Sequence, residues 1–300
     1  MASVTVRIPA TTGNMGAGFD CIGMALSLYN TIQITETNSD LTVSVEGEGQ
    51  DLVPLDAENV CVQAAIRVCE ATGRNPDGLH FNLQHDIPIS RGLGSSGVGI
   101  VAGAYGMNEL MGAPLDTATV IRICSDMEGH PDNVVPSLLG GLSISGERYG
   151  TIVYRTVSVP PDLSAIVAVP DYTLATKLAR EALPETVPMQ DAVYNMCSVG
   201  LMIQGMMTKD YDLLRAGTDD RLHQPYRASL VPGLKQVMEA ALSQGAHSAA
   251  LSGAGPTVIA LASKNEAQVA TAMSSTFDEH GISCRTLTLK IDNHGARRLN

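Results

Sequence analysis

Apolar and polar residues alternate in several segments of the chain, a period typical of β-strands with one buried face. Val4, Val6 and Ile8 share one face of the first segment, which predicts a strand that ends at Pro9. The other segments predicted to be strands cover residues 21–37, 41–45, 79–83, 142–145, 165–169 and 284–291. Two short runs, 249–251 and 258–261, flank a glycine-containing turn and predict a β-hairpin.

Apolar residues at three- and four-residue spacing predict helices between these strands. The predicted helices cover residues 56–72, 114–128, 191–207, 211–216, 233–243 and 266–277. Their irregular interleaving with strands favours an α+β fold over a doubly wound sheet. The adjacent Pro160 and Pro161 predict a boundary between an N-terminal domain, 1–158, and a C-terminal domain, 159–300.

A glycine-rich loop leads into a further long helix that reaches about Leu110. Gly92 and Gly94 permit backbone angles that other residues resist, and they let a ligand approach the main chain. Ser95 and Ser96 lie where the helix begins, so they can cap it and supply hydroxyl groups. A loop of this kind at a helix N-terminus presents free N–H groups to an anion. The segment therefore predicts a phosphate-binding loop.

The helix after this loop is apolar on nearly every side, which predicts that it is buried. Gly99, Gly103 and Gly106 form a stripe along it. Each interior glycine costs roughly 1 kcal/mol relative to alanine. We therefore expect another backbone segment to pack closely against the stripe.

Composition limits the classes of function. The net charge of −12 opposes nucleic-acid binding, which requires a basic face. The six cysteines are scattered without a CxxC pair, which argues against disulfides and a zinc site and favours a cytoplasmic location. The N-terminus resembles no targeting peptide, and no apolar run approaches the roughly 18 residues that span a membrane. We expect neither a nucleic-acid partner nor membrane contact.

Gly92, Gly94 and Gly97 also satisfy the pattern G-x-G-x-x-G, so dinucleotide binding is an alternative. Residues 88–91 do not form the end of a buried strand, and Asp116 follows a proline instead of ending a second strand, which weighs against that fold. The Walker A pattern is absent from the sequence. A glycine-rich turn without a ligand would be a sufficient explanation if the loop stood alone.

Four motifs occur in a fixed order along the chain. They are PATTGNMGAGFD at 9–20, PISRGLGSSG at 88–97, EGHPDNV at 128–134 and LSGAGPTV at 251–258. Together they resemble the motifs of the GHMP kinases, a superfamily of small-molecule kinases. The resemblance narrows to the homoserine kinase family through Asn14 with Gly18-Phe19-Asp20, through EGHPDN, and through HQPYR at 223–227 followed by LVPG. It covers essentially the whole chain.

The resemblance implies a two-domain α+β fold, with a ribosomal-protein-S5-domain-2-like N-terminal domain and a ferredoxin-like C-terminal domain. It implies ATP-dependent phosphorylation of the L-homoserine hydroxyl to O-phospho-L-homoserine for threonine biosynthesis, with Mg²⁺ as cofactor. We also expect a homodimer. The alternatives are a GHMP kinase with a different hydroxyl substrate, and a catalytically silent GHMP-fold sensor.

By the same resemblance, the glycine-rich loop is expected to wrap the triphosphate of ATP, and Asn59 to contact adenine. The nucleotide-binding residues would be Asn59, Pro88, Ile89, Ser90, Arg91, Gly92, Leu93, Gly94, Ser95, Ser96 and Gly97. Ser96 and Glu128 would hold Mg²⁺, which needs few protein ligands because it keeps water and phosphate oxygens. Residues 252–256 are expected to support the loop.

L-Homoserine is a zwitterion, so its pocket needs an anion for the ammonium group and cations for the carboxylate. The substrate-binding residues implied by the resemblance are Asn14, Asp20, Asp132, Arg180 and Arg227. The two arginines would bind the carboxylate, because a guanidinium can hold it with two hydrogen bonds. Asp20 and Asp132, beside Asn14, would face the ammonium group.

The resemblance also implies three catalytic residues, Asn133, Asp132 and Thr176. Asn133 would position the attacking hydroxyl, and Thr176 would lie near the γ-phosphate. Asp132 could act as a base, although positioning and charge neutralisation can supply most of the catalysis of phosphoryl transfer. Taken singly, each of these could be an ordinary surface or structural residue. His130 and His223 are expected to be structural.

Overall fold

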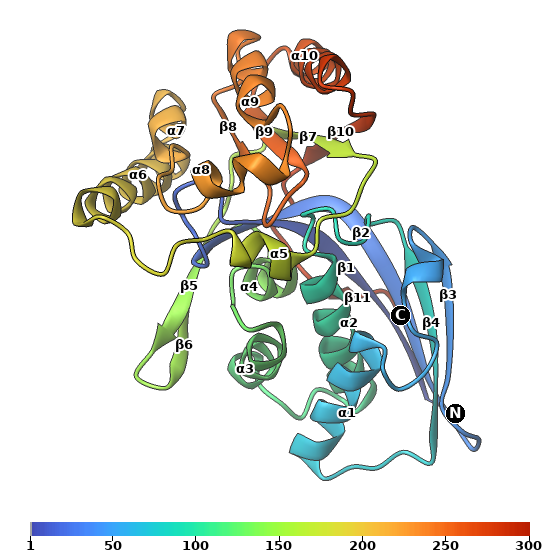
Figure 1. Cartoon of the computed structure of the whole chain (residues 1–300). Helices are drawn as coiled ribbons and strands as arrows, with labels where there is room; N and C mark the ends of the chain where they lie inside the picture. Colours follow the sequence, from blue (N-terminus) through green and yellow to red (C-terminus); the bar gives the residue numbers. More distant parts are fainter. Residues whose placement is uncertain (1) are drawn as a thin grey trace.

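Two β-sheets, each packed against helices, form the part of the chain that the computed structural model describes, residues 2–300 (Figure 1). The strands of the first sheet are β1 (Ser3–Gly13), β2 (Ile22–Thr37), β3 (Thr42–Gly47), β4 (Gly78–His85), β5 (Leu142–Arg148), β6 (Thr151–Val157) and β11 (Arg297–Arg298). Their order is β11-β1-β2-β4-β3, and β5 joins β2 to β6. The pairs are antiparallel except for β3 with β4, which is parallel.

The helices that follow β3 and β4 gather on one side of the first sheet (Figure 1). They are α1 (Val60–Thr72), α2 (Ser95–Leu110), α3 (Thr117–Glu128) and α4 (Val134–Leu139), and a short 3₁₀ helix covers Gln50–Leu52. Helix α2 lies in the middle, packed against β1, β2 and the other three helices. A Cβ added at Gly103 would collide with the backbone oxygen of Cys61 in α1. The expected close approach of another backbone segment is therefore confirmed.

The second sheet lies above the first in Figure 1 and carries its own helices. Its strands are β7 (Ser164–Pro170), β8 (Ser248–Leu251), β9 (Val258–Ala262) and β10 (Cys284–Lys290), all antiparallel in the order β10-β7-β9-β8. Its helices are α5 (Thr176–Glu181), α6 (Met189–Thr208), α7 (Asp212–Gly217), α8 (Gln224–Arg227), α9 (Leu234–Ser243) and α10 (Glu266–Glu279), with a 3₁₀ turn at Ala228–Leu230. Numbered within this sheet, the strand order is 4-1-3-2, the order of a ferredoxin-like fold. The predicted α+β class is confirmed.

The C-terminal residues return to the first sheet. Ile291 forms a bridge to Leu26 of β2, and β11 pairs with β1. Asp292 fixes this return, because its carboxylate accepts hydrogen bonds from the N–H groups of His294 and Gly295 and from Arg297. The chain changes sheets between β6 and β7, and the domain boundary at 158/159 stays a prediction.

Most predicted strands and helices are present, with several corrections. Pro9 does not end the first strand, because β1 continues to Gly13 through a bulge at Pro9/Ala10, a position where a missing N–H is tolerated. Residues 224–227, where the pattern predicts no helix, form α8 with Pro225 in its first turn. Helix α4 and strand β6 were not predicted from the pattern, and α1 begins four residues later than expected.

Two predictions from composition can be compared with the described residues. The six cysteines are free, with no disulfide between them. Among the helices of residues 2–300, none is both long and apolar enough to cross a bilayer.

Candidate active site

The glycine-rich loop between β4 and α2 adopts the backbone conformation that its sequence favours. Ser90, Gly92 and Gly94 have positive φ values of 54°, 83° and 70°. Gly94 is the N-cap of α2, and a Cβ on it would collide with the Thr11 hydroxyl. The first N–H groups of a helix have no intrahelical partners, so this end of α2 offers donors and positive potential to an anion.

The two serines have a different role from the predicted one. Neither caps α2, because the N-cap is Gly94 and its helix end has no side-chain cap. Ser95 Oγ instead accepts a hydrogen bond from Ser90 N at 3.2 Å, which closes the loop. Ser96 Oγ donates to Glu128 Oε2 at 2.7 Å. The expectation of helix capping was wrong, whereas the expectation of hydroxyl donors holds for Ser96.

The second sheet supports the loop from above. Ser252 Oγ donates to Gly92 O at 2.6 Å, Thr257 N donates to Arg91 O at 3.3 Å, and Leu174 N donates to Ser90 O at 3.0 Å. The loop is thus held by segments that follow it by more than 80 residues. The expectation that residues 252–256 support it is confirmed by these contacts.

Ser96 and Glu128 bring a hydroxyl and a carboxylate together below the loop. Glu128 is the last residue of α3, which Asp116 caps and Gly129 ends in a left-handed conformation. Burial raises the pKa of Glu128, and the hydrogen bond from Ser96 partly offsets that shift. Oxygen donors of this kind are those that Mg²⁺ prefers, so the pair fits the expected metal.

Three residues of the turn after α3 border the cavity: His130, Asp132 and Asn133. Asp132 is buried and contacts both the ring of His130 and the amide of Asn133. Burial opposes protonation of His130, but the adjacent Asp132 carboxylate outweighs it and raises the pKa of His130. Asn133 Oδ1 accepts a hydrogen bond from Thr11 Oγ1 at 2.8 Å, which fixes the orientation of the amide. A Cβ on Gly13 would collide with Asp132, so this approach depends on glycine.

Asp20 and Arg180 form an ion pair at the border of the cavity. The guanidinium of Arg180 donates to both carboxylate oxygens of Asp20, each at 2.9 Å. The hydrogen bond with Asp20 raises the pKa of Arg180. The two residues assigned to opposite ends of the substrate therefore neutralise each other when no ligand lies between them.

Arg227 is buried, with 2% of its surface exposed. Its Nε donates to Ala179 O at 3.0 Å, and its Nη1 lies 3.2 Å from Gly253 O and 3.3 Å from His223 Nδ1. Within residues 2–300, Nη2 has no hydrogen-bond acceptor, and Arg227 borders the cavity. Three of its five N–H groups are used by the protein, which leaves the two on Nη2 for a ligand.

One cavity brings most of the expected residues together. From the predicted sets, it is bordered by Asn14, Asp20, Ser90, Gly92, Gly94, Ser95, Ser96, Glu128, Asp132, Asn133, Thr176, Arg180 and Arg227. An adjoining hollow is bordered by Asn59 and Ile89 and shares Ser90, Ser95 and Ser96 with the first. Pro88, Arg91, Leu93 and Gly97 border neither of these two hollows.

Asn59 borders the adjoining hollow and also has a structural role. Its Oδ1 accepts from Cys61 N at 3.0 Å as the cap of α1, and its Nδ2 donates to Pro54 O at 2.8 Å. Its polar atoms are therefore engaged by the protein. The expected contact with adenine stays a prediction.

Sequence reasoning missed several residues of the site. Thr11 orients Asn133, and His130 borders the cavity beside Asp132. Asp220 and His223 lie behind Arg227. His130 and His223 stand inside the quoted motifs, which was a usable signal. Thr11 also lies inside a quoted motif, 9–20, whereas Asp220 carries no local pattern that marks it.

Comparisons with known proteins show the family of the chain. The family described as GHMP kinases N terminal domain matches residues 59–141, and the family described as GHMP kinases C terminal matches residues 202–279. A homoserine kinase from Moorella thermoacetica is 40% identical over 97% of this chain and 98% of its own length. One from Desulfitobacterium hafniense is 41% identical over 98% of this chain and 99% of its own length.

The fold also resembles a solved structure. The crystal structure of a homoserine kinase from Cytophaga hutchinsonii superimposes with a TM-score of 0.91 at 28% sequence identity. The alignment covers 100% of this chain and 98% of that one. Both domains are therefore included in the likeness.

Proposed function

The chain belongs to the homoserine kinases of the GHMP kinase family, and we propose that it transfers the γ-phosphoryl group of ATP to the side-chain hydroxyl of L-homoserine. The main observation in support of this proposal is that one cavity is bordered both by the glycine-rich loop and by the Asp20–Arg180 ion pair. The product, O-phospho-L-homoserine, would serve threonine biosynthesis.

Recognition of the substrate would exchange one ion pair for two. The ammonium group would take the place of Arg180 beside Asp20, and the carboxylate would take the place of Asp20 beside Arg180. Arg227 would add its free Nη2 to the carboxylate. Because a zwitterion replaces both partners at once, neither charge is left alone in the cavity, which is the costly alternative. An alcohol without an ammonium group would leave Asp20 without a cation.

In the reaction, the hydroxyl oxygen would form a bond to the γ-phosphorus while the bond from that phosphorus to the β–γ bridging oxygen breaks. Asn133, held by Thr11, would orient the hydroxyl, and the Asp132 carboxylate would accept its proton. Thr176, the first residue of α5, would lie at the γ-phosphate. Positioning and charge neutralisation can supply most of the catalysis in phosphoryl transfer.

Nucleotide binding would use the free N–H groups at the start of α2. Ser96 and Glu128 would hold Mg²⁺, which neutralises phosphate charge when it is bound. The adjoining hollow beside Asn59 is the space available for the base and ribose. The protein's own contribution is to hold the loop in place through Ser252, Thr257 and Leu174.

The test is a coupled ADP-release assay with MgATP and a panel of alcohols: L-homoserine, D-homoserine, L-serine, L-threonine and mevalonate. We expect turnover with L-homoserine. In Asn133→Ala, kcat should fall by at least about 100-fold, as for removal of an oriented hydrogen-bond donor. In the matched control Asn75→Ala, which changes an exposed loop residue, kcat should not fall. Turnover only with mevalonate would contradict the amino-acid pocket. Nucleotide binding without any turnover would contradict kinase activity.

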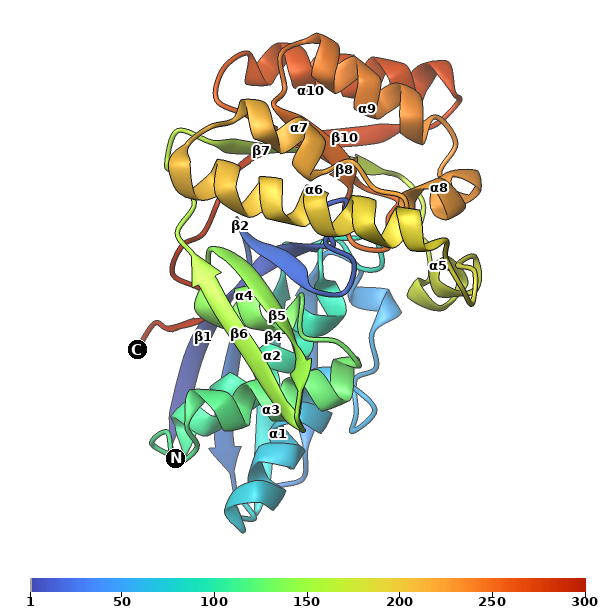
Figure 2. The same cartoon turned by 90° about the vertical axis from the view of Figure 1, so that its left-hand side faces the viewer.

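We also propose that the chain forms a homodimer through α6, which lies across the front of the molecule in Figure 2. Its 20 residues include a single charged one, Asp191. Met189, Val193, Met196 and Met207 are 52–78% exposed along it. A two-fold axis at Gly200, where a Cβ would meet open space, would place Val193 opposite Met207 of a second copy and Asp191 opposite Lys209.

Sedimentation velocity tests this interface. We expect a dimer for the wild type and a monomer for Met196→Glu, whereas Leu52→Glu, which changes an apolar side chain exposed elsewhere, should leave the dimer intact. A monomeric wild type would overturn the homodimer. A dimer that persists in Met196→Glu would overturn α6 as its interface.

A further inference from the structure

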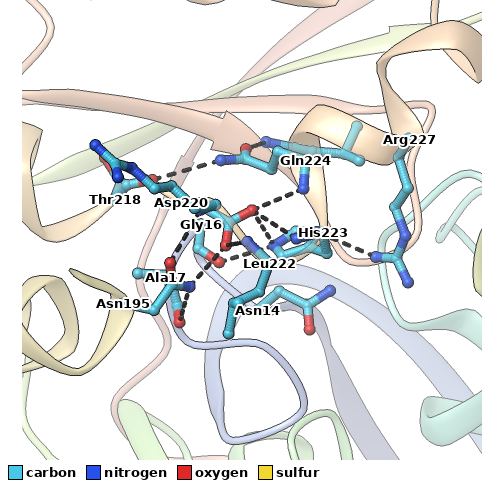
Figure 3. Close-up of polar contacts among 12 residues, drawn as sticks. Asn14, Gly16, Ala17, Asn195, Thr218, Asp220, Leu222, His223, Gln224 and Arg227 are labelled. Carbon is cyan, nitrogen blue, oxygen red and sulfur yellow. Dashed lines mark hydrogen bonds and ion pairs between the residues drawn. The ribbon is translucent and has the colours of Figure 1, made fainter. Parts of the chain in front are cut away.

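A buried polar network lies behind the substrate cavity, and none of its members belongs to a site set assigned from sequence. It contains Asn195 of α6, Asp220, His223 and Gln224, all at most 6% exposed (Figure 3). At one end it contacts the loop after β1, and at the other it contacts Arg227. The network therefore joins two parts of the proposed homoserine site that are more than 200 residues apart in sequence.

The partners of His223 determine its proton. Its Nε2 lies 2.8 Å from the carbonyl oxygen of Gly16, which can only accept a hydrogen bond. Its Nδ1 lies 3.3 Å from Nη1 of Arg227, which can only donate. His223 must therefore be neutral, with the proton on Nε2. Burial lowers the pKa of His223, in agreement with a neutral ring.

Asp220 holds this histidine in place. Its carboxylate accepts hydrogen bonds from the N–H groups of Leu222, His223 and Gln224 and from the side chain of Asn195. The Asn195 amide also donates to Ala17 O. The backbone of the turn before α8 is therefore fixed to α6 and to the loop after β1.

The contacts of His223 close a ring. From Arg227, one path runs through the imidazole to Gly16 and then two residues along the chain to Asn14. Asn14 Nδ2 donates to Gly253 O at 2.8 Å, and Gly253 O also accepts from Arg227 Nη1 at 3.2 Å. Asn14 Oδ1 accepts from Asp20 N at 3.0 Å. The ring thus connects the acid assigned to the ammonium group with the arginine assigned to the carboxylate.

We propose that neutral His223 is a positioning residue for L-homoserine, which fixes Arg227 relative to residues 14–20 and so sets the spacing between the carboxylate and ammonium sites. This inference rests on the proposed function. His223 does not border the cavity, so it would act on the substrate only through other residues. Its two nitrogens act on different ends of the substrate, Nδ1 through Arg227 and Nε2 through Gly16.

Two substitutions separate these two actions. In His223→Asn, the amide oxygen can replace Nδ1 as the acceptor for Arg227, while the link to Gly16 is lost. In His223→Gln, the longer side chain can place an amide N–H near the position of Nε2 and keep the link to Gly16, while Arg227 loses its acceptor. Both variants lose the stacking of the ring on Phe19, whose centroid is 5.3 Å away, so the packing loss is shared.

The experiment measures kcat and KM for L-homoserine, for 4-hydroxybutanoate, which lacks the ammonium group, and for L-homoserinamide, which lacks the carboxylate. For His223→Gln, we expect the preference for L-homoserine over L-homoserinamide to fall about 10-fold, equivalent to about 1.4 kcal/mol, because Arg227 loses the acceptor that fixes it. For His223→Asn, we expect the preference over 4-hydroxybutanoate to fall by a similar factor. The KM for MgATP should stay within a factor of about two in both.

The following outcomes would overturn the inference or the proposed function. Equal changes of both preferences in both variants, or a parallel rise of KM for MgATP, would indicate a merely structural histidine and overturn the inference. The control variant is His247→Gln, which changes a histidine that lies beside Ser263 and does not border the cavity. This variant should behave as the wild type.

Calorimetric titration with L-homoserine repeats the comparison without turnover. A wild type that neither binds nor phosphorylates L-homoserine overturns the proposed function, whereas an active wild type without the split overturns this inference alone.

Discussion

The two ends of the cavity are built differently. The phosphate end is built around one contiguous loop whose backbone N–H groups would bind the phosphates, and its conformation depends on positive φ values at Gly92 and Gly94. Side chains enter this end only at the proposed metal pair, Ser96 and Glu128. The amino-acid end depends on side chains from separate segments, among them Asp20, Arg180 and Arg227, which meet only in the folded chain. The local sequence favours the conformation of the phosphate loop, which the second sheet then supports, whereas the amino-acid end exists only through tertiary contacts.

The difference shows how each end can fail. Backbone donors cannot be removed by truncating a side chain, so the phosphate end should tolerate changes at Ser95 but not a Cβ at a glycine. The amino-acid end should tolerate changes in backbone flexibility but not the loss of a charge, since an unpaired buried charge is costly. Substitutions of the two kinds can therefore test whether the division is real.

The largest effect is expected at Gly94. In Gly94→Ala the new Cβ combines an unfavourable φ of 70° with a collision against Thr11, which in turn holds Asn133. We expect kcat/KM to fall by at least about 100-fold, because misplacement of reacting groups by about 1 Å can have that effect. Steady-state kinetics with L-homoserine and MgATP would measure it.

Gly112→Ala is the matched control for this change. Gly112 also has a positive φ, 82°, but an added Cβ meets nothing within 4 Å. It should lose stability by about 1 kcal/mol from strain alone and keep its activity per folded molecule. Equal kinetic losses in the two variants would contradict a special role of Gly94.

The next largest effect concerns the ion pair that the substrate is proposed to divide. We expect Asp20→Asn and Arg180→Met each to raise KM for L-homoserine about 10- to 100-fold, as for loss of a charged hydrogen bond. KM for MgATP should not change. Because the two residues contact each other directly, the double variant should lose less than the two single effects combined. Additive losses would mean that the residues act independently.

The phosphate end could be predicted largely from sequence because its signals are local. A glycine pair before a long apolar helix defines the loop and the helix start, and the order of four motifs placed it in a family. The prediction that the serines cap α2 was wrong because Gly94 occupies the N-cap position. Ser95 and Ser96 instead form hydrogen bonds with Ser90 and Glu128.

The amino-acid end could be predicted only as a set of residue types. Nothing local to Arg180 indicates that it pairs with Asp20, which is 160 residues away. Likewise, the sequence around Arg227 does not reveal that Ala179 O, Gly253 O and His223 take up three of its N–H groups. Such contacts follow from how the two sheets pack together. The spacing of apolar residues in the sequence contains no information about that packing.

A smaller effect is expected from the hydroxyl at the phosphate end. Ser96→Ala removes the hydrogen bond to Glu128. In the wild type this hydrogen bond partly offsets the rise in the pKa of Glu128 that burial causes. If the pair holds Mg²⁺ as proposed, the Mg²⁺ concentration for half-maximal activity should rise about 10-fold, a loss of roughly 1.4 kcal/mol. Ser95→Ala, which loses only a contact to Ser90 N, should change it little. A titration of activity with Mg²⁺ distinguishes the two, and identical curves would contradict a metal-binding role for Ser96.

The smallest effect is one of stability and belongs to the amino-acid end. The pKa of His223 is lowered from its ordinary value of 6.5, chiefly by burial. The positive charge of Arg227 also lowers this pKa, whereas the negative charges of Asp220 and Asp20 raise it but do not outweigh burial. A group whose pKa is lower in the folded than in the unfolded state stabilises the fold fully above pH 6.5 and loses that contribution as pH falls toward the folded-state pKa. Between pH 6.5 and 5.5 the wild type should therefore lose up to about 1.4 kcal/mol that His223→Gln does not lose, the limit for one proton over one pH unit. Urea unfolding at both pH values measures the difference. If the wild type and His223→Gln lose stability equally over this interval, His223 is not the neutral link that the tertiary contacts of this end require.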